Sequence, residues 1–139
     1  MKSFQIKLMT ISLGLFLMFF FANIVKAQTT AGWTIPAKFK TMKNPVASGK
    51  ESISEGKDLY AKHCKSCHGS AGLGDGTKAA GLDVSCGDFS SKKFQTSADG
   101  EIFFQMSEGK GKMPSFKKLI PEDNSRWAIV NFLRTLAAK

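Results

Sequence analysis

The segment Cys64-Lys-Ser-Cys67-His68 restricts the fold of this chain more than any other part of the sequence. Two cysteines three positions apart, followed at once by a histidine, form the C-x-x-C-H pattern of covalent haem attachment. Thiols at this spacing share one side of a helical turn, where each can add to a vinyl group of the same porphyrin. The next imidazole then lies under the ring and can bind its iron. The motif predicts one haem c, attached to Cys64 and Cys67, with His68 as an axial ligand.

The opposite face of the iron needs a ligand from elsewhere in the chain. His63, the only other histidine, lies on the tether itself and cannot reach that face. We therefore expect a methionine thioether, and His/Met ligation raises the reduction potential.

Met113 is the favoured methionine because it lies between Gly111 and Pro114, in a loop that can present a side chain inward. Met106 lies on the apolar side of a predicted helix, which favours core packing, and Met42 precedes the first helix. The alternative for Met113 is a loop side chain that only packs, with water or nothing on the iron.

The first 27 residues are predicted to be a signal peptide. Lys2 and Lys7 form a basic start, an apolar run extends from residue 8 to residue 22, and small residues at the cleavage site end at Ala27. The alternative is an uncleaved inner-membrane anchor, because the apolar run approaches the roughly 18–20 residues of a spanning helix. We expect export to the periplasm, with membrane association only if the segment is not cleaved.

Residues 28–50 are rich in Thr, Pro, Gly and Lys without sustained periodicity, which predicts an N-terminal extension on the domain surface. Partial disorder is the alternative. The side chains that could fix the extension to a core are Trp33, Ile35, Phe39 and Met42. Residues 51–139 are predicted to form the only domain.

The fold class predicted for this domain is all-α, with three core helices and long irregular loops. The first helix should run from about residues 52–54 to Lys65, the second from an N-cap at Ser97 to Gly109, and the third from Pro121 to about Leu136. On the last helix, Asn131, Arg134 and Thr135 are expected to face water. Residues 69–87 read as an irregular loop with a short turn at 78–82.

The net charge favours some partners and excludes others. Cleavage would remove three lysines and leave 17 basic and 11 acidic residues, a balance of +6 (17 − 11). Either the lysines only solvate the surface, or they steer the protein toward an acidic redox partner. We expect no nucleic-acid partner, because no basic stripe with interleaved aromatics occurs.

Three cysteines leave Cys86 unpaired once two are bound to haem. We expect Cys86 to be buried as a small apolar side chain; a reactive thiol or an intermolecular disulfide is the alternative.

Two haem-free interpretations of the cysteines are disfavoured. A thioredoxin-type dithiol needs a βαβ context that this chain lacks. A zinc site from Cys64, Cys67, His68 and Cys86 would need adjacent residues to point to one metal.

The chain resembles class I cytochromes c over roughly residues 50–139. The resemblance rests on three segments in the expected order, Gly56-x-x-x-Tyr60-x-x-x-Cys64-x-x-Cys67-His68-Gly69, Lys112-Met113-Pro114 and Trp127-Ala-Ile-Val-Asn-Phe132-Leu-Arg134. It implies a cytochrome c fold with one haem c between three helices, His68 and Met113 as axial ligands, and Gly56 and Tyr60 meeting Ile129 and Phe132 where the first and last helices cross.

One departure concerns the histidine side. Such proteins usually carry a proline near the carbonyl that orients the histidine, but no proline occurs here between Pro45 and Pro114. A carbonyl from residues 82–86 would have to orient the histidine instead.

The function expected for this chain is one-electron transfer between redox partners in a bacterial cell envelope, without enzyme activity. The alternative is an enzyme or gas sensor, which would need an open sixth position.

Overall fold

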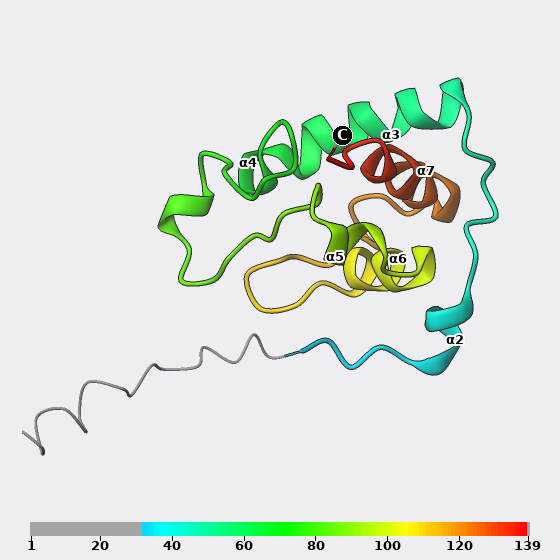
Figure 1. The fold of residues 1–139 in the computed structure, drawn as a ribbon, viewed down its shortest axis with the longest axis horizontal. Coiled ribbons are helices and arrows are strands. Elements are labelled where there is room, and N and C mark those ends of the chain that lie inside the picture. Colours follow the sequence, from blue (N-terminus) through cyan, green and yellow to red (C-terminus); the bar gives the residue numbers. More distant parts are fainter. Residues whose placement is uncertain (1–31, 139) are drawn as a thin grey trace, which may run out of the picture. The chain divides into compact units, whose positions relative to one another are not determined.

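The computed structural model describes residues 32–138, and the chain from Trp33 onward forms one compact unit. Its elements are α2 (Ala37–Thr41), α3 (Lys50–His63), α4 (Lys65–His68), the 3-10 helix η1 (Ala79–Gly81), α5 (Lys92–Gln95), α6 (Asp99–Glu108) and α7 (Asp123–Arg134) (Figure 1). No strand occurs within residues 32–138, which confirms the all-α prediction. None of the helices described is long and apolar enough to span a membrane. The predicted signal peptide lies outside the described residues.

Helices α3 and α7 make the most extensive contact between elements and lie against each other in Figure 1. At their closest point Gly56 of α3 meets the backbone of Ala128 on α7. A Cβ added to Gly56 would lie 2.1 Å from the carbonyl oxygen of Ala128. The crossing implied by the resemblance is therefore present, and Gly56 is the residue that permits it.

The core forms where α6 packs on α7. The rings of Phe103 and Trp127 stack with centroids 4.0 Å apart at 10°. From α7, the large buried apolar side chains are Trp127, Ile129, Val130, Phe132 and Leu133. Burying a side chain of this size stabilises the fold by about 1.5–3 kcal/mol, so α7 is the central element of the core.

Several helix boundaries differ from the predictions. Helix α3 begins earlier, because the Ser52 hydroxyl accepts from the Gly49 backbone N–H at 3.1 Å and completes the N-terminus. The N-cap of α6 is Ala98, whose N–H donates to the Glu101 carboxylate at 3.1 Å, so the predicted cap at Ser97 is wrong. Pro121 likewise lies outside α7, whose N-cap is Glu122.

Asn131 is buried, so its predicted place on the wet side of α7 is wrong. The Asn131 side chain is 5% exposed. Its Oδ1 accepts from Asn44 Nδ2 at 2.8 Å, and its Nδ2 donates to the carbonyl of Val46 at 3.1 Å and to the Ser52 hydroxyl at 3.1 Å. A face of α7 that would otherwise meet water is therefore covered by the N-terminal extension, through polar contacts that fully use the amide.

Residues 33–47, within the described part of the extension, are called the strap below. Its helix α2 packs on α6. The N–H of Gly100 donates to the carbonyl of Met42 at 3.1 Å, and a Cβ on Gly100 would lie 2.3 Å from the carbonyl oxygen of Phe39. Trp33 and Phe39 both contact the ring of Phe104. The strap is thus fixed to the core, as one of the two interpretations expected.

We expect Gly56→Ala to lower the free energy of unfolding by about 2 kcal/mol or more. The added methyl group forces α3 away from α7, and overpacking of this kind outweighs the helix propensity of about 1 kcal/mol that alanine gains. Urea unfolding of the holoprotein measures the change. Gly81→Ala is the matched control, because nothing lies within 4 Å of a Cβ at that position. Equal stability of the two variants would contradict the close approach.

Tyr60 connects α3 to the residue that follows α4. Its hydroxyl donates to the carbonyl of Gly69 at 2.6 Å, and the side chain is 2% exposed. Burial first, and then Cys64 and Asp75, raise the pKa of Tyr60 above its ordinary value. A raised pKa means that the folded state holds this proton more tightly than the unfolded chain does.

Tyr60→Phe should lower the free energy of unfolding by about 1–3 kcal/mol, because it leaves the buried Gly69 carbonyl without its donor. The difference from the natural chain is constant below pH ~10 and shrinks at higher pH, where the unfolded tyrosine ionises first. Tyr60 is the only tyrosine, so phenolate absorbance reports its ionisation directly. Ionisation at the ordinary pKa would contradict this placement.

Candidate functional site

The junction between α3 and α4 brings Cys64, Cys67 and His68 onto one turn. Cys64 ends α3 with φ −115 and begins the next turn, where its carbonyl accepts from the N–H of Cys67 at 3.1 Å and of His68 at 2.9 Å. All three side chains are half-buried, and no cysteine in the described chain forms a disulfide. The turn therefore presents two available thiols and an imidazole from consecutive positions.

The loop after His68 folds back along this turn instead of leaving it. Backbone N–H groups of Gly74, Gly76 and Lys78 donate to the carbonyls of His68, Cys67 and Ser66 at 2.9, 3.2 and 2.8 Å. A Cβ on Gly76 would lie 2.4 Å from the Ser66 oxygen, so glycine is needed for the approach. The predicted irregular loop is therefore tied to α4 by its own backbone.

The imidazole of His68 stacks on Phe89, with ring centroids 4.5 Å apart at 23°. Phe89 is itself held by Gln95, whose Nε2 donates to its carbonyl at 2.7 Å. Burial lowers the pKa of His68, and the nearby backbone carbonyl of Cys86 opposes this effect. The sequence alone predicts neither the stacking of Phe89 on His68 nor the hydrogen bond from Gln95, because residues 87–96 show no periodic pattern of apolar side chains.

The Cys86 carbonyl lies in the segment expected to replace the missing proline. It is close enough to raise the pKa of the imidazole, yet Nδ1 of His68 is buried and makes no hydrogen bond of ordinary geometry within residues 32–138. A buried ring nitrogen without a partner calls for an explanation. Movement of the imidazole toward that carbonyl, once the other nitrogen binds a metal, would satisfy it.

Burial is the main influence on the protonation of the Cys64 and Cys86 thiols at this site. Burial, and then the neighbouring Cys67, raise the pKa of the Cys64 thiol to about 12. Burial and Cys67 also raise the pKa of Cys86, which is half-buried. Among the described residues, no three His, Cys, Asp or Glu side chains gather as a metal-binding group.

Met113 lies in a tight turn that begins at Lys110. The N–H of Lys110 donates to the carbonyl of Met113 at 2.8 Å, and the N–H of Met113 donates back to the carbonyl of Lys110 at 3.0 Å. Gly111 takes φ +58 within the turn. The Met113 side chain is half-buried and packs against the core. Met106, by contrast, is 4% exposed inside the core on α6, as expected.

Hydrogen bonds fasten the segment after Met113 to α6. The N–H of Phe116 donates to the carbonyl of Met106 at 3.2 Å, and the Ser115 hydroxyl donates to the carbonyl of Ser107 at 2.6 Å. The hydroxyl of Ser107 accepts from Nε of the buried Arg126 at 3.1 Å. Through Ser107, α7 thus also supports the methionine loop.

These residues fit a covalently bound haem. The turn 64–68 supplies two thiols and an imidazole whose buried Nδ1 has no partner. A separate loop supplies a thioether that packs on the same core. Thiols, imidazole and thioether are the groups that attach a haem c and bind its iron.

Comparisons with known proteins agree with this chemistry. The family described as cytochrome C oxidase, cbb3-type, subunit III matches residues 51–133, more than half of the chain. No curated protein sequence matches.

Two solved structures are similar to this chain. One belongs to the Kuenenia stuttgartiensis reducing HAO-like protein complex Kustc0457/Kustc0458, with TM-score 0.62 and 27% identity over 68% of this chain and 47% of that chain. This chain therefore spans about half the length of that relative. The other is the KustC0563 c-type cytochrome, with TM-score 0.53 and 29% identity over 60% of this chain and 98% of that chain.

The helical fold, the turn that carries two thiols and an imidazole, and the match over residues 51–133 lead to one conclusion. The chain is a class I cytochrome c with one covalently bound haem c, and it belongs to the family described as cytochrome C oxidase, cbb3-type, subunit III.

Proposed function

We propose that this electron carrier exchanges single electrons between redox proteins of a bacterial cell envelope and catalyses no reaction of its own. The observation that carries the proposal is the Lys110–Met113 turn, which holds a thioether against the core. With His68 on one side and Met113 on the other, the iron would have two protein ligands and no open position for a substrate. Haem c then supplies only one-electron exchange.

The proposed roles divide the site residues between attachment and ligation. Cys64 and Cys67 would hold the haem through thioether bonds, and His68 and Met113 would bind its iron. Phe89 fixes the plane of the imidazole by stacking. A haem packed against this core would be shielded from water, which together with a thioether ligand would favour the reduced state.

Redox partners are proposed to be acidic at their docking surface. Every lysine within residues 32–138 is exposed, and the sequence beyond Ala27 carries the +6 balance given above (17 − 11). A basic surface accelerates the encounter with an acidic partner, and salt weakens the effect. The similar chain of known structure belongs to a protein complex, which supports a partner protein for this chain also.

Met113→Ala should abolish the methionine–iron charge-transfer absorption of the ferric protein, lower its reduction potential and allow exogenous imidazole to bind. The reason is that the thioether ligand is lost while the covalent attachment remains. Optical titration and redox potentiometry measure these changes. Met106→Leu is the control, because Met106 is buried in α6 and should only affect stability slightly.

A natural chain that binds imidazole as readily as Met113→Ala would contradict closed ligation. That result would instead favour the alternative of an enzyme or gas sensor, because a labile sixth position is what such a protein needs.

Cell fractionation followed by a haem-stained denaturing gel tests export and covalent attachment together. We expect a stained band in the soluble periplasmic extract, 27 residues shorter than the full chain. The stain should be lost in the double variant Cys64→Ala, Cys67→Ala and kept in Cys86→Ala, because only the first pair is placed to bind the haem. Stain confined to membranes would replace the periplasmic proposal with the uncleaved anchor.

A further inference from the structure

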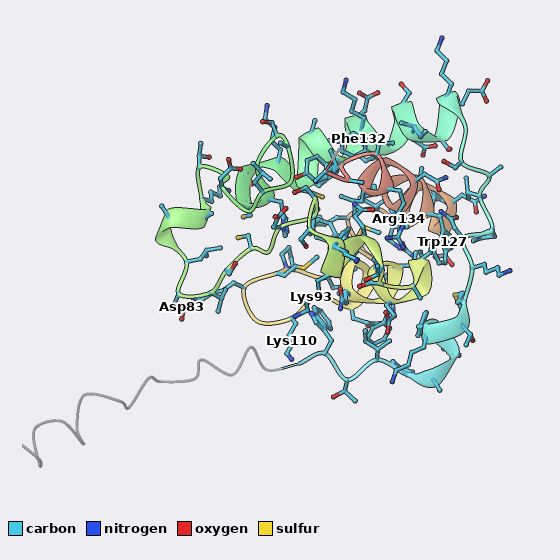
Figure 2. All side chains as sticks on the ribbon, viewed as in Figure 1. Asp83, Lys93, Lys110, Trp127, Phe132 and Arg134 are labelled. Atoms are coloured by element: carbon cyan, nitrogen blue, oxygen red, sulfur yellow. The ribbon has the colours of Figure 1, made fainter. Side chains whose placement is uncertain are left out.

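Trp33, at the start of the strap, lies between α6 and the turn that bears Met113. Its ring meets Phe104 of α6 edge-on, with centroids 6.4 Å apart at 77°. On the other side, Nζ of Lys110 lies 5.5 Å from the centroid of the Trp33 ring. Figure 2 shows Lys110 near the first described residues of the chain. A residue far from the haem motif in sequence thus contacts the methionine turn.

Lys110 and Met113 move together because they close the same turn. Two reciprocal backbone hydrogen bonds, at 2.8 and 3.0 Å, join them across Gly111 and Lys112. The four residues from Lys110 to Met113 include only one that is even half-buried, which is Met113 itself. A turn with so little buried surface opens more easily than the core does, so an added contact at Lys110 matters.

We propose that Trp33 is a positioning residue that holds the Lys110–Met113 turn closed, through the cation–π contact of its ring with the Lys110 ammonium, and so keeps the Met113 thioether on the iron. The inference rests on the proposed ligation by Met113. It gives the strap a role beyond covering α6 and α7, namely control of how often the sixth position opens.

The binding of exogenous imidazole to the ferric holoprotein measures this opening. Imidazole binds only to the open state, so its apparent Kd equals the intrinsic Kd divided by the open fraction. Loss of one exposed cation–π contact should raise the open fraction about two- to fivefold. Trp33→Leu should therefore lower the apparent Kd about two- to fivefold, with Met113→Ala as the fully open limit.

Phe39→Leu is the matched control. Phe39 belongs to the same strap and packs on the same ring of Phe104, with centroids 4.8 Å apart, and it also has a lysine over its face. That lysine, Lys38, is on the strap and not on the methionine turn. Phe39→Leu should lower the midpoint of urea unfolding about as much as Trp33→Leu does, yet leave the imidazole Kd unchanged.

The lysine partner gives a second, independent comparison. Lys110→Gln should lower the imidazole Kd as Trp33→Leu does, and Lys110→Arg should restore it, because a guanidinium also binds over an aromatic face. The double variant Trp33→Leu, Lys110→Gln should be no more open than either single variant.

Three results would overturn the inference. They are an apparent imidazole Kd that is unchanged in Trp33→Leu, an equal decrease of that Kd in Phe39→Leu, or a Kd in the double variant that is lowered by the product of the two single effects. Failure of the ligation proposal has a different signature, since the charge-transfer absorption would then either be absent from the natural chain or persist in Met113→Ala. Loss of that absorption in Met113→Ala, with no effect of Trp33→Leu on imidazole binding, would reject the positioning role alone.

Discussion

The close approach of α3 and α7 at Gly56 is the contact on which the remaining structure depends. The backbone of α7 occupies the space where a side chain of α3 would be, so the two axes cannot shift without losing the core behind α7. Cys64 follows Gly56 by eight positions, or about 12 Å of continuous helix. The crossing therefore determines where the haem-binding turn lies relative to the core, although no haem-binding residue takes part in it.

Features that depend on residues within one or two helical turns could be predicted from the sequence. The C-x-x-C-H turn, the chain reversal at Gly109 with φ +67, and the apolar side of α7 are all where local pattern puts them. Errors arose where an element's partner is distant. Ser97 has the chemistry of an N-cap, but its hydroxyl donates to the carbonyl of Lys93 at 3.3 Å, while the Glu101 carboxylate completes the start of α6.

The burial of Asn131 also depends on partners that are distant in the sequence. Periodicity along α7 places it among polar neighbours, and a polar face is normally a wet one. The strap arrives from more than 80 positions earlier in the chain and offers Asn44 and Val46 as partners. An amide can be buried when its donors and acceptors are matched, but the sequence of α7 contains no sign of those partners. The supports of the methionine loop, Ser107 and Arg126, were missed for the same reason.

The two sides of the site are built in different ways. Around His68, most of the supporting hydrogen bonds join residues between Tyr60 and Lys78, so the chain loses little entropy in forming them. Around Met113, Ser115 joins the segment after the turn to Ser107 of α6, and Lys110 joins the turn itself to Trp33 of the strap. The methionine side therefore depends on tertiary packing that must persist for the turn to stay closed. Since local opening follows the least buried segments, the proposed ligand Met113 would leave the iron before the His68 side opens, and Trp33 of the strap contacts the turn that bears Met113.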